Sequence, residues 1–103
     1  MNIIQGERGS GKTTKLIQAC AEHGGYIVCR SQEEAHRIDD LSVEMGVQIP
    51  FPLTYGELLC KQYYAKGIRK IHIDDADELL RYIAQGLIVE SITLSTERVE
   101  GEG

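Results

Sequence analysis

The chain has 103 residues, of which 42% are hydrophobic, and a formal net charge of -5 at pH 7. A chain of this length can form one packed core but no second nucleotide-handling lobe. Its net negative charge argues against a surface that binds nucleic acid through positive charge alone. No apolar run approaches the roughly 18 residues of a membrane span, and Met1 does not open a secretory leader. We therefore expect a cytoplasmic protein with a single domain over 1–96 and a polar tail over 97–103 that frays.

Strands and helices alternate along the first half of the sequence. A short apolar strand is predicted over 2–5, followed by a glycine-rich loop and by a helix over 13–23 that ends at two glycines. A buried strand over 26–30 precedes a second helix, and a capping box of Ser31 and Glu34 marks where that helix begins. The first half therefore repeats one strand and helix unit.

The second half continues this alternation. Two prolines within 49–54 indicate a strand that is short or at an edge, and a capping box at Thr54 starts the next helix. A strand over 70–74, a helix over 77–85 and a last strand over 89–95 follow. Strands separated by helices of this length pair in parallel, so we predict an α/β fold, a three-layer α/β/α sandwich around a mostly parallel sheet of about five strands.

The loop after the first strand carries the most specific motif of the chain. Its sequence, GERGSGKT, fits the pattern Gly-x-x-x-x-Gly-Lys-Ser/Thr of a phosphate-binding loop. Backbone N–H groups and the positive end of the following helix would surround a di- or triphosphate, with Lys12 on the β- and γ-phosphates and the Thr13 hydroxyl on Mg²⁺. We predict ATP and Mg²⁺ as cofactors, and the nucleotide-binding residues Gly6, Arg8, Gly9, Ser10, Gly11, Lys12, Thr13 and Thr14. The alternative is a glycine-rich turn without a ligand.

A second acidic motif, IHIDDAD, ends the strand over 70–74. Ligands of open α/β sheets gather at such strand ends, so Asp74 is predicted to hold Mg²⁺ together with Thr13. Asp75 lies where many ATPases with such a loop carry the glutamate that orients the attacking water, and we assign Lys12 and Asp75 as catalytic. The alternative is that Asp74, Asp75 and Asp77 only cap the following helix.

Cysteine and histidine do not form a metal-binding pattern in this sequence. Cys20, Cys29 and Cys60 are not grouped with a histidine at metal-ligand spacing, and we interpret all three as small buried hydrophobic residues. His72 lies between two isoleucines of a strand and is interpreted as a hydrogen-bonded core or layer-facing residue rather than a catalyst.

The order of motifs resembles the first RecA-like domain of superfamily 1 and 2 helicases. The matching pieces, in chain order, are GERGSGKTT, YIVCRSQEEAHRI, PLTYGELL, KIHIDDADELL and ITLST. The likeness covers residues 1 to about 96, and its first and fourth pieces are the specific ones. The chain also resembles small stand-alone P-loop proteins of phages and other mobile elements of Gram-positive bacteria, which are described as ATPase-like and are closer in length.

The resemblance implies further sites. It places the strand over 89–95 between the loop strand and the strand over 70–74, with Ser95 or Thr96 as a sensor of the γ-phosphate, although both residues could simply end a strand. It places Arg30 and Tyr55 at strand ends where helicases contact single-stranded nucleic acid, and Tyr63 and Tyr64 are further candidates for base stacking, although these two are more often core and rim residues of a helix. Helicases take an arginine finger from a second domain, so we expect a homo-oligomer or a protein partner to supply one, with Arg8, Arg81 and Arg98 as candidates in trans.

Three functions fit this sequence. The first is Mg²⁺-dependent ATP binding with weak or partner-dependent hydrolysis, serving phage or mobile-element nucleic acid metabolism. The second is a small nucleoside or nucleotide kinase, disfavoured because no zinc-binding cysteine set and no arginine-rich lid follow the loop. The third is a catalytically silent adaptor with the same fold, which the aspartate at Asp75 in place of glutamate favours.

Overall fold

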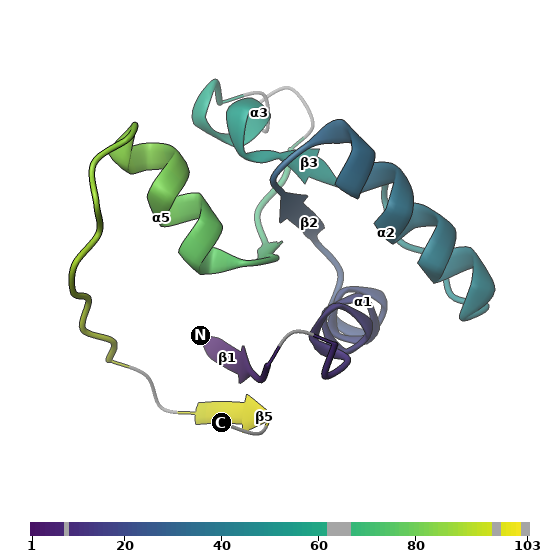
Figure 1. Cartoon of the computed structure of the whole chain (residues 1–103). Coiled ribbons are helices and arrows are strands. Elements are labelled where there is room, and N and C mark those ends of the chain that lie inside the picture. Colours follow the sequence, from purple (N-terminus) through teal and green to yellow (C-terminus); the bar gives the residue numbers. More distant parts are fainter. Residues whose placement is uncertain (8, 62–66, 96–97, 102–103) are drawn as a thin grey trace.

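The computed structural model of the protein describes residues 1–7, 9–61, 67–95 and 98–101. Helices and strands alternate along most of the chain, as Figure 1 shows. The elements, in chain order, are β1 (Asn2–Gln5), α1 (Lys12–His23), β2 (Tyr26–Cys29), α2 (Gln32–Glu44), β3 (Leu53–Thr54), α3 (Tyr55–Leu59), β4 (Ile71–Ile73), α5 (Ala76–Ala84) and β5 (Arg98–Gly101).

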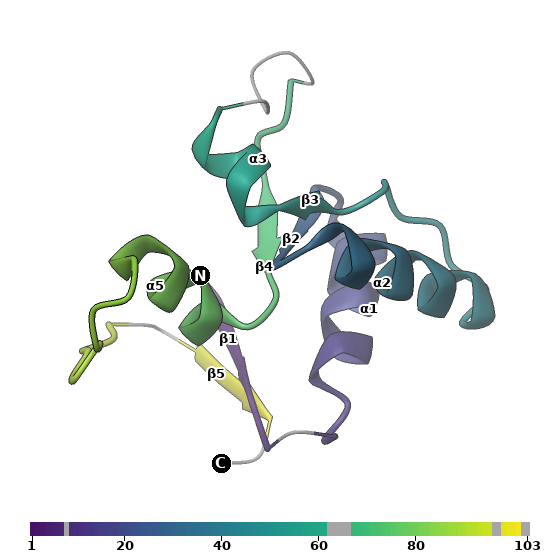
Figure 2. The same cartoon turned by 45° about the horizontal axis from the view of Figure 1, so that its top comes forward.

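The described strands form two parallel sheets. In the larger sheet β2 lies between β3 and β4, and Val28 is in register with Leu53 on one side and with Ile73 on the other. In the smaller sheet β1 pairs with β5. Figure 2 shows the two sheets separately. The α/β class and the parallel pairing are confirmed, and β3 is both short and at an edge as predicted, but the single RecA-like sheet of about five strands is wrong.

The last strand lies later in the chain than the sequence predicts. Residues 89–95 have no regular secondary structure, and Figure 1 shows them in the long connection between α5 and β5. An alternation of apolar and polar residues is typical of a strand with one buried face. A strand forms, however, only where the edge of a neighbouring strand is available for backbone hydrogen bonds. The edge of β1 is taken by Arg98–Gly101, inside the segment that we expected to fray.

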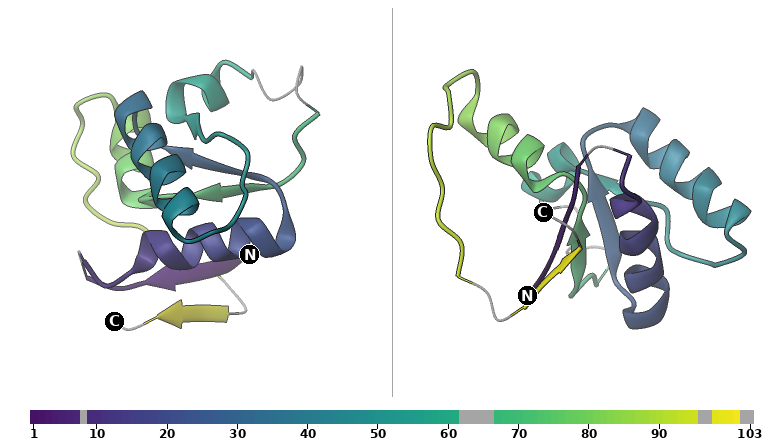
Figure 3. Two further views of the ribbon diagram at one scale, coloured as in Figure 1. Left: turned by 90° about the vertical axis from the view of Figure 1, so that its right-hand side faces the viewer. Right: turned by 60° about the horizontal axis from the view of Figure 1, so that its bottom comes forward.

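The core lies on both faces of β2. Alternate residues of this strand point to opposite faces, so Ile27 and Cys29 face α1 and α2, whereas Val28 faces α3. The first group packs with Ile17, Cys20, Ala35 and Ile38, and the second with Leu53, Tyr55 and, from α5, Leu79. Figure 3 shows α1 and α2 on one side of the strands and α5 on the other. Helices therefore cover both faces of the three-stranded sheet.

Two of the three cysteines are buried as predicted. Cys20 and Cys29 lie in the core, and burial raises the pKa of the Cys29 thiol to about 11. Cys60 is exposed, contrary to the prediction, because α3 ends at Leu59 and Cys60 is its C-terminal capping residue. His72 is half-buried rather than fully in the core, and its Nε2 lies 2.7 Å from the Gly24 carbonyl oxygen. In the described part of the chain, every helix is too short or too polar to cross a membrane.

The core assignment predicts a large effect at Ile38, which is fully buried between α2 and β2. Replacing Ile38 by alanine leaves a cavity, and we expect the free energy of unfolding to fall by about 2–5 kcal/mol in urea denaturation. Val43 lies on the same helix with 70% of its surface exposed, so Val43→Ala is the matched control and should stay within about 0.5 kcal/mol of wild type. Similar losses in the two variants would contradict the assigned core.

Candidate functional site

The glycine-rich loop connects β1 to the start of α1. Gly9 and Gly11 have φ angles of 81° and 84°, in the left-handed region that glycine adopts without steric cost. Gly11 is the N-terminal capping residue of α1 and has no side chain with which to bond the first-turn N–H groups. Those groups have no partner within a helix, and the dipole of the helix favours an anion beside them. The first turn of α1 therefore presents backbone donors at its positive end, whereas the Ser10 N–H in the loop already donates to the Glu7 carbonyl oxygen at 3.1 Å.

Lys12, the first residue of α1, turns back across this loop. Its Nζ donates a hydrogen bond of 2.5 Å to the carbonyl oxygen of Gly6, at the other end of the loop. The structure thus places the predicted phosphate-binding ammonium group over the loop, held by a single carbonyl. A phosphate that entered the loop would replace this carbonyl as the partner of Lys12.

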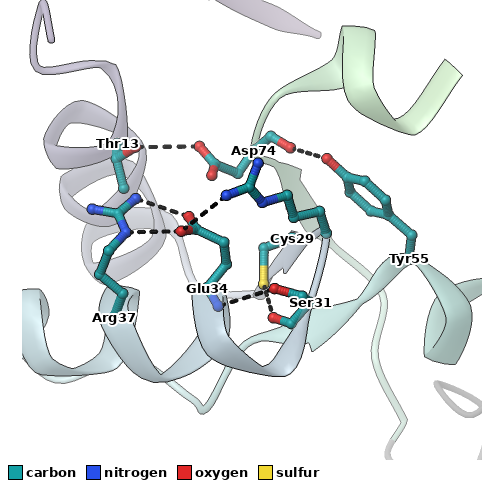
Figure 4. A network of polar contacts seen from close by, with 8 residues as sticks. Thr13, Cys29, Ser31, Glu34, Arg37, Tyr55 and Asp74 are labelled. Carbon is teal, nitrogen blue, oxygen red and sulfur yellow. Dashed lines mark hydrogen bonds and ion pairs between the residues drawn. The ribbon is translucent and has the colours of Figure 1, made fainter. Parts of the chain in front are cut away.

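Thr13 and Asp74, the two predicted metal ligands, meet across the molecule. The Thr13 hydroxyl lies 3.4 Å from the Asp74 Oδ1 and donates toward it, although the residues are 61 positions apart in the chain. This contact joins the first turn of α1 to the end of β4, as Figure 4 shows. The distance is longer than an optimal O–H···O bond, so the contact holds the two groups only loosely.

Asp74 is a buried carboxyl group, with 7% of its surface exposed. Its pKa is raised to about 6, chiefly because burial disfavours the charged form, and secondly because Asp75 and Glu34 are negatively charged. The hydrogen bond from Thr13 and the charge of Arg37 lower the pKa, but by less. Asp74 is therefore mostly ionised at pH 7, at a cost to the stability of the fold.

Tyr55 binds the backbone of the acidic motif through its hydroxyl group. Its side chain is 1% exposed, and its hydroxyl donates to the carbonyl oxygens of Asp74 and Asp75, at 2.6 and 2.9 Å. The predicted role of Tyr55 as a nucleic acid contact is therefore wrong, because no base can reach a buried ring. The capping box of Thr54 and Glu57, which starts α3 as predicted, orients this tyrosine.

Asp75 has an unusual backbone. Its φ of 55° lies in the left-handed region, which costs a residue with a side chain about 1–2 kcal/mol, and such strain often accompanies function. Asp75 is the N-terminal capping residue of α5, but its exposed side chain makes no capping hydrogen bond. Asp77 instead accepts a hydrogen bond of 3.2 Å from Arg81. Side-chain capping therefore does not explain the row of aspartates.

A cluster of charges that the sequence analysis did not assign lies beside Asp74. The Glu34 carboxylate accepts hydrogen bonds from the Arg37 Nε and NH2 at 3.0 and 2.9 Å, and Arg30 lies 3.7 Å away. Arg37 lowers the pKa of Glu34, mainly through these hydrogen bonds. Arg30, predicted as a nucleic acid contact, thus belongs to this cluster. Opposite charges four residues before Glu34, just ahead of α2, and three residues after it, on α2, were the signal that could have found this cluster.

Several predicted residues lie elsewhere. Ser95 is exposed in the irregular connection before β5, so it ends no strand. Arg81, one candidate for an arginine in trans, pairs with Asp77 and Glu78 on the surface of α5. Four predicted residues lie outside the described ranges: Arg8, Tyr63, Tyr64 and Thr96. For Arg98, the first residue of β5, the structure describes the backbone but not the side chain.

The donor atoms at this site fit a magnesium ion that is shared with a ligand. Across the described residues, His, Cys, Asp and Glu do not form a group of three that could hold a metal ion by themselves. Thr13 and Asp74 supply one hydroxyl and one carboxylate, and Mg²⁺ is commonly bound by one or two such oxygens together with substrate phosphates. A metal at this site would therefore depend on a phosphate ligand in the loop.

Two surface hollows lie away from this site. One, of about 430 Å³, is formed by the second half of α2 and residues 47–50, and the other, of about 420 Å³, lies beside α3 and residues 68–71. Loop residues and Asp74 line neither of them. The candidate site lies instead between the first turn of α1 and the end of β4.

Comparison of the chain with protein-family models, with curated proteins and with solved structures gives no match in any of the three. Function is therefore inferred from the chemistry of the loop and of Asp74.

The raised pKa of Asp74 predicts a stability that depends on pH. The pKa rises from 3.8 to about 6 on folding, so the cost of ionising Asp74 is absent below pH 3.8, grows as the pH rises and is complete above 6. Asp74→Asn should therefore raise the free energy of unfolding above pH 6, by up to about 3 kcal/mol, and by less at pH 5. Urea denaturation at pH 5 and 8, without Mg²⁺, measures this. The control is Asp40→Asn, the same change on an exposed part of α2. A gain that is independent of pH would contradict the raised pKa.

Proposed function

We propose that this protein binds a Mg²⁺-nucleoside triphosphate, with ATP as the ligand, at the loop between β1 and α1. The observation that supports this most is the approach of the Thr13 hydroxyl to the Asp74 carboxylate at 3.4 Å. These two residues come from separate motifs, each of which predicts one half of a magnesium site. A glycine-rich turn without a ligand gives no reason for them to meet.

Each residue of the proposed site has a distinct task. The N–H groups of the first turn of α1, which follow Gly11, bind phosphate oxygens, and Lys12 leaves the Gly6 carbonyl to bind the β- and γ-phosphates. Thr13 and Asp74 would hold Mg²⁺, which neutralises charge on the phosphates when it is bound. The remaining members of the proposed nucleotide site are Arg8, Ser10 and Thr14.

Hydrolysis by this site is proposed to be slow. Asp75 would orient the attacking water, but its side chain is exposed and one methylene shorter than glutamate. An arginine finger contributes on the order of 10³ to 10⁵ in rate, and a neighbouring subunit or a partner protein is proposed to supply one. The resemblance to phage and mobile-element proteins supports a role in nucleic acid metabolism.

A catalytically silent adaptor is the second candidate function. It is favoured by the division of the described strands into two sheets, which leaves β1 outside the sheet that contains β4. Such a protein would use nucleotide only as a structural ligand. Multiple-turnover hydrolysis of ATP by the pure protein would exclude it.

Lys12→Ala tests the binding proposal. Saturating Mg²⁺-ATP, at 100 times its dissociation constant, should add roughly 2.7 kcal/mol to the stability of the wild type. The variant should lose this gain, because the phosphates lose their ammonium partner, while its stability without nucleotide falls by no more than about 1.5 kcal/mol for the lost bond to Gly6. Thermal denaturation with and without nucleotide measures both quantities.

Lys15→Ala is the control for this experiment, because Lys15 lies one turn from Lys12 on α1 and is exposed. It should keep the full nucleotide-dependent gain. A wild-type protein that neither ATP nor GTP stabilises would contradict the proposed function. A Lys12→Ala variant that is unfolded without nucleotide would show that the bond to Gly6 is structural.

A further inference from the structure

We infer that Arg37 is a γ-phosphate-responsive residue, which Glu34 holds in the nucleotide-free protein and which exchanges Glu34 for the γ-phosphate when a triphosphate binds. This inference rests on the proposed function and adds to it the residue that distinguishes a triphosphate from a diphosphate. It places an arginine for the phosphate within the chain itself, close enough to Asp74 for the two charges to interact.

The first observation is a difference between two similar capping motifs. At Thr54 the box is complete, since Glu57 accepts a hydrogen bond from the Thr54 backbone N–H at 2.9 Å. At Ser31 the side-chain oxygen accepts a hydrogen bond from the Glu34 N–H, but the Glu34 carboxylate accepts two hydrogen bonds from Arg37 instead. Glu34 therefore gives its carboxylate to an arginine rather than to the helix terminus.

The second observation is the position of this pair. Figure 4 shows the Glu34 carboxylate between Arg37 and Asp74, with the Arg37 guanidinium extended toward Thr13. The negative charges of Asp74 and Asp75 add to the effect of the Glu34 hydrogen bonds in raising the pKa of Arg37. Arg37 therefore lies within electrostatic reach of Asp74, the carboxylate of the proposed metal site, and of Asp75.

The third observation is that the pair is unequal in exposure. The Arg37 side chain is 55% exposed, whereas the Glu34 side chain is 16% exposed. The arginine thus has room to turn, while the carboxylate is fixed by its surroundings. Arg30, 3.7 Å from Glu34, remains as a counter-charge when Arg37 leaves. The exchange therefore does not leave a partly buried carboxylate alone, which would be costly.

In the proposed exchange, the hydrogen bonds that Arg37 loses to Glu34 are replaced by hydrogen bonds to phosphate. A guanidinium group offers the same planar fork of donors to a carboxylate and to a phosphate, so Arg37 replaces one bidentate partner by another. A diphosphate has no γ-phosphate to offer, and Arg37 stays with Glu34. Because the terminal phosphate carries more negative charge than a carboxylate, the exchange strengthens the binding of triphosphate, and it leaves the binding of diphosphate unchanged.

The test compares two ligands, adenylyl imidodiphosphate and ADP, each with Mg²⁺, by isothermal titration calorimetry. Arg37→Ala should weaken binding of the triphosphate analogue about tenfold or more, as expected for a lost hydrogen bond between charged groups, and change ADP binding less than about twofold. Arg37→Lys, which keeps the charge without the fork, should recover part of this loss. Glu34→Gln, which releases Arg37, should tighten binding of the analogue only.

The matched control is Arg69→Ala, because Arg69 is exposed and precedes β4, at the strand end opposite Asp74. It should bind both ligands as the wild type does. Equal effects of Arg37→Ala on the two ligands, or no effect, would overturn the inference while leaving the proposed function intact. A wild type that binds neither ligand would overturn both. Thermal denaturation of each variant verifies that it is folded.

Discussion

A buried negative charge at the end of β4 is the constraint on which the rest of this site depends. Asp74 is 7% exposed and has a pKa of about 6, so the folded protein holds an ionised carboxylate that its surroundings disfavour. Three elements keep it in place, because Thr13 approaches it from α1, Tyr55 binds its backbone from α3, and β2 pairs with β4. Proteins tolerate such a cost where function requires it.

Two cations in the described part of the proposed site, Lys12 and Arg37, already have partners within the protein. Lys12 is bound to the Gly6 carbonyl, and Arg37 is bound to Glu34. A nucleotide that binds these two groups would have to replace their existing partners one by one. Such an arrangement favours ligands that carry several phosphates, because each exchange needs its own anionic group. Selectivity for a triphosphate then follows from the number of exchanges rather than from the shape of a closed pocket.

Local signals in the sequence predicted the parts of this structure that depend on neighbouring residues. The loop, the strand before it and the capping box at Thr54 are determined within a few positions, and each formed as predicted. The pairing of β1 with β5 and the irregular course of 89–95 depend on which distant edge is free, and periodicity carries no such information. The role of Arg37 was likewise hidden, because only the fold brings α2 beside Asp74.

The central claim is that Thr13 and Asp74 act together on one metal-bound nucleotide. The most direct measurement is a double-mutant cycle on the dissociation constant of Mg²⁺-ATP, with Thr13→Val, Asp74→Asn and the double variant, by isothermal titration calorimetry. If both residues hold the same ion, each single variant weakens binding, and the double variant is little weaker than the worse single one. Losses in binding free energy that add fully, or binding in the wild type that does not depend on Mg²⁺, would contradict the claim.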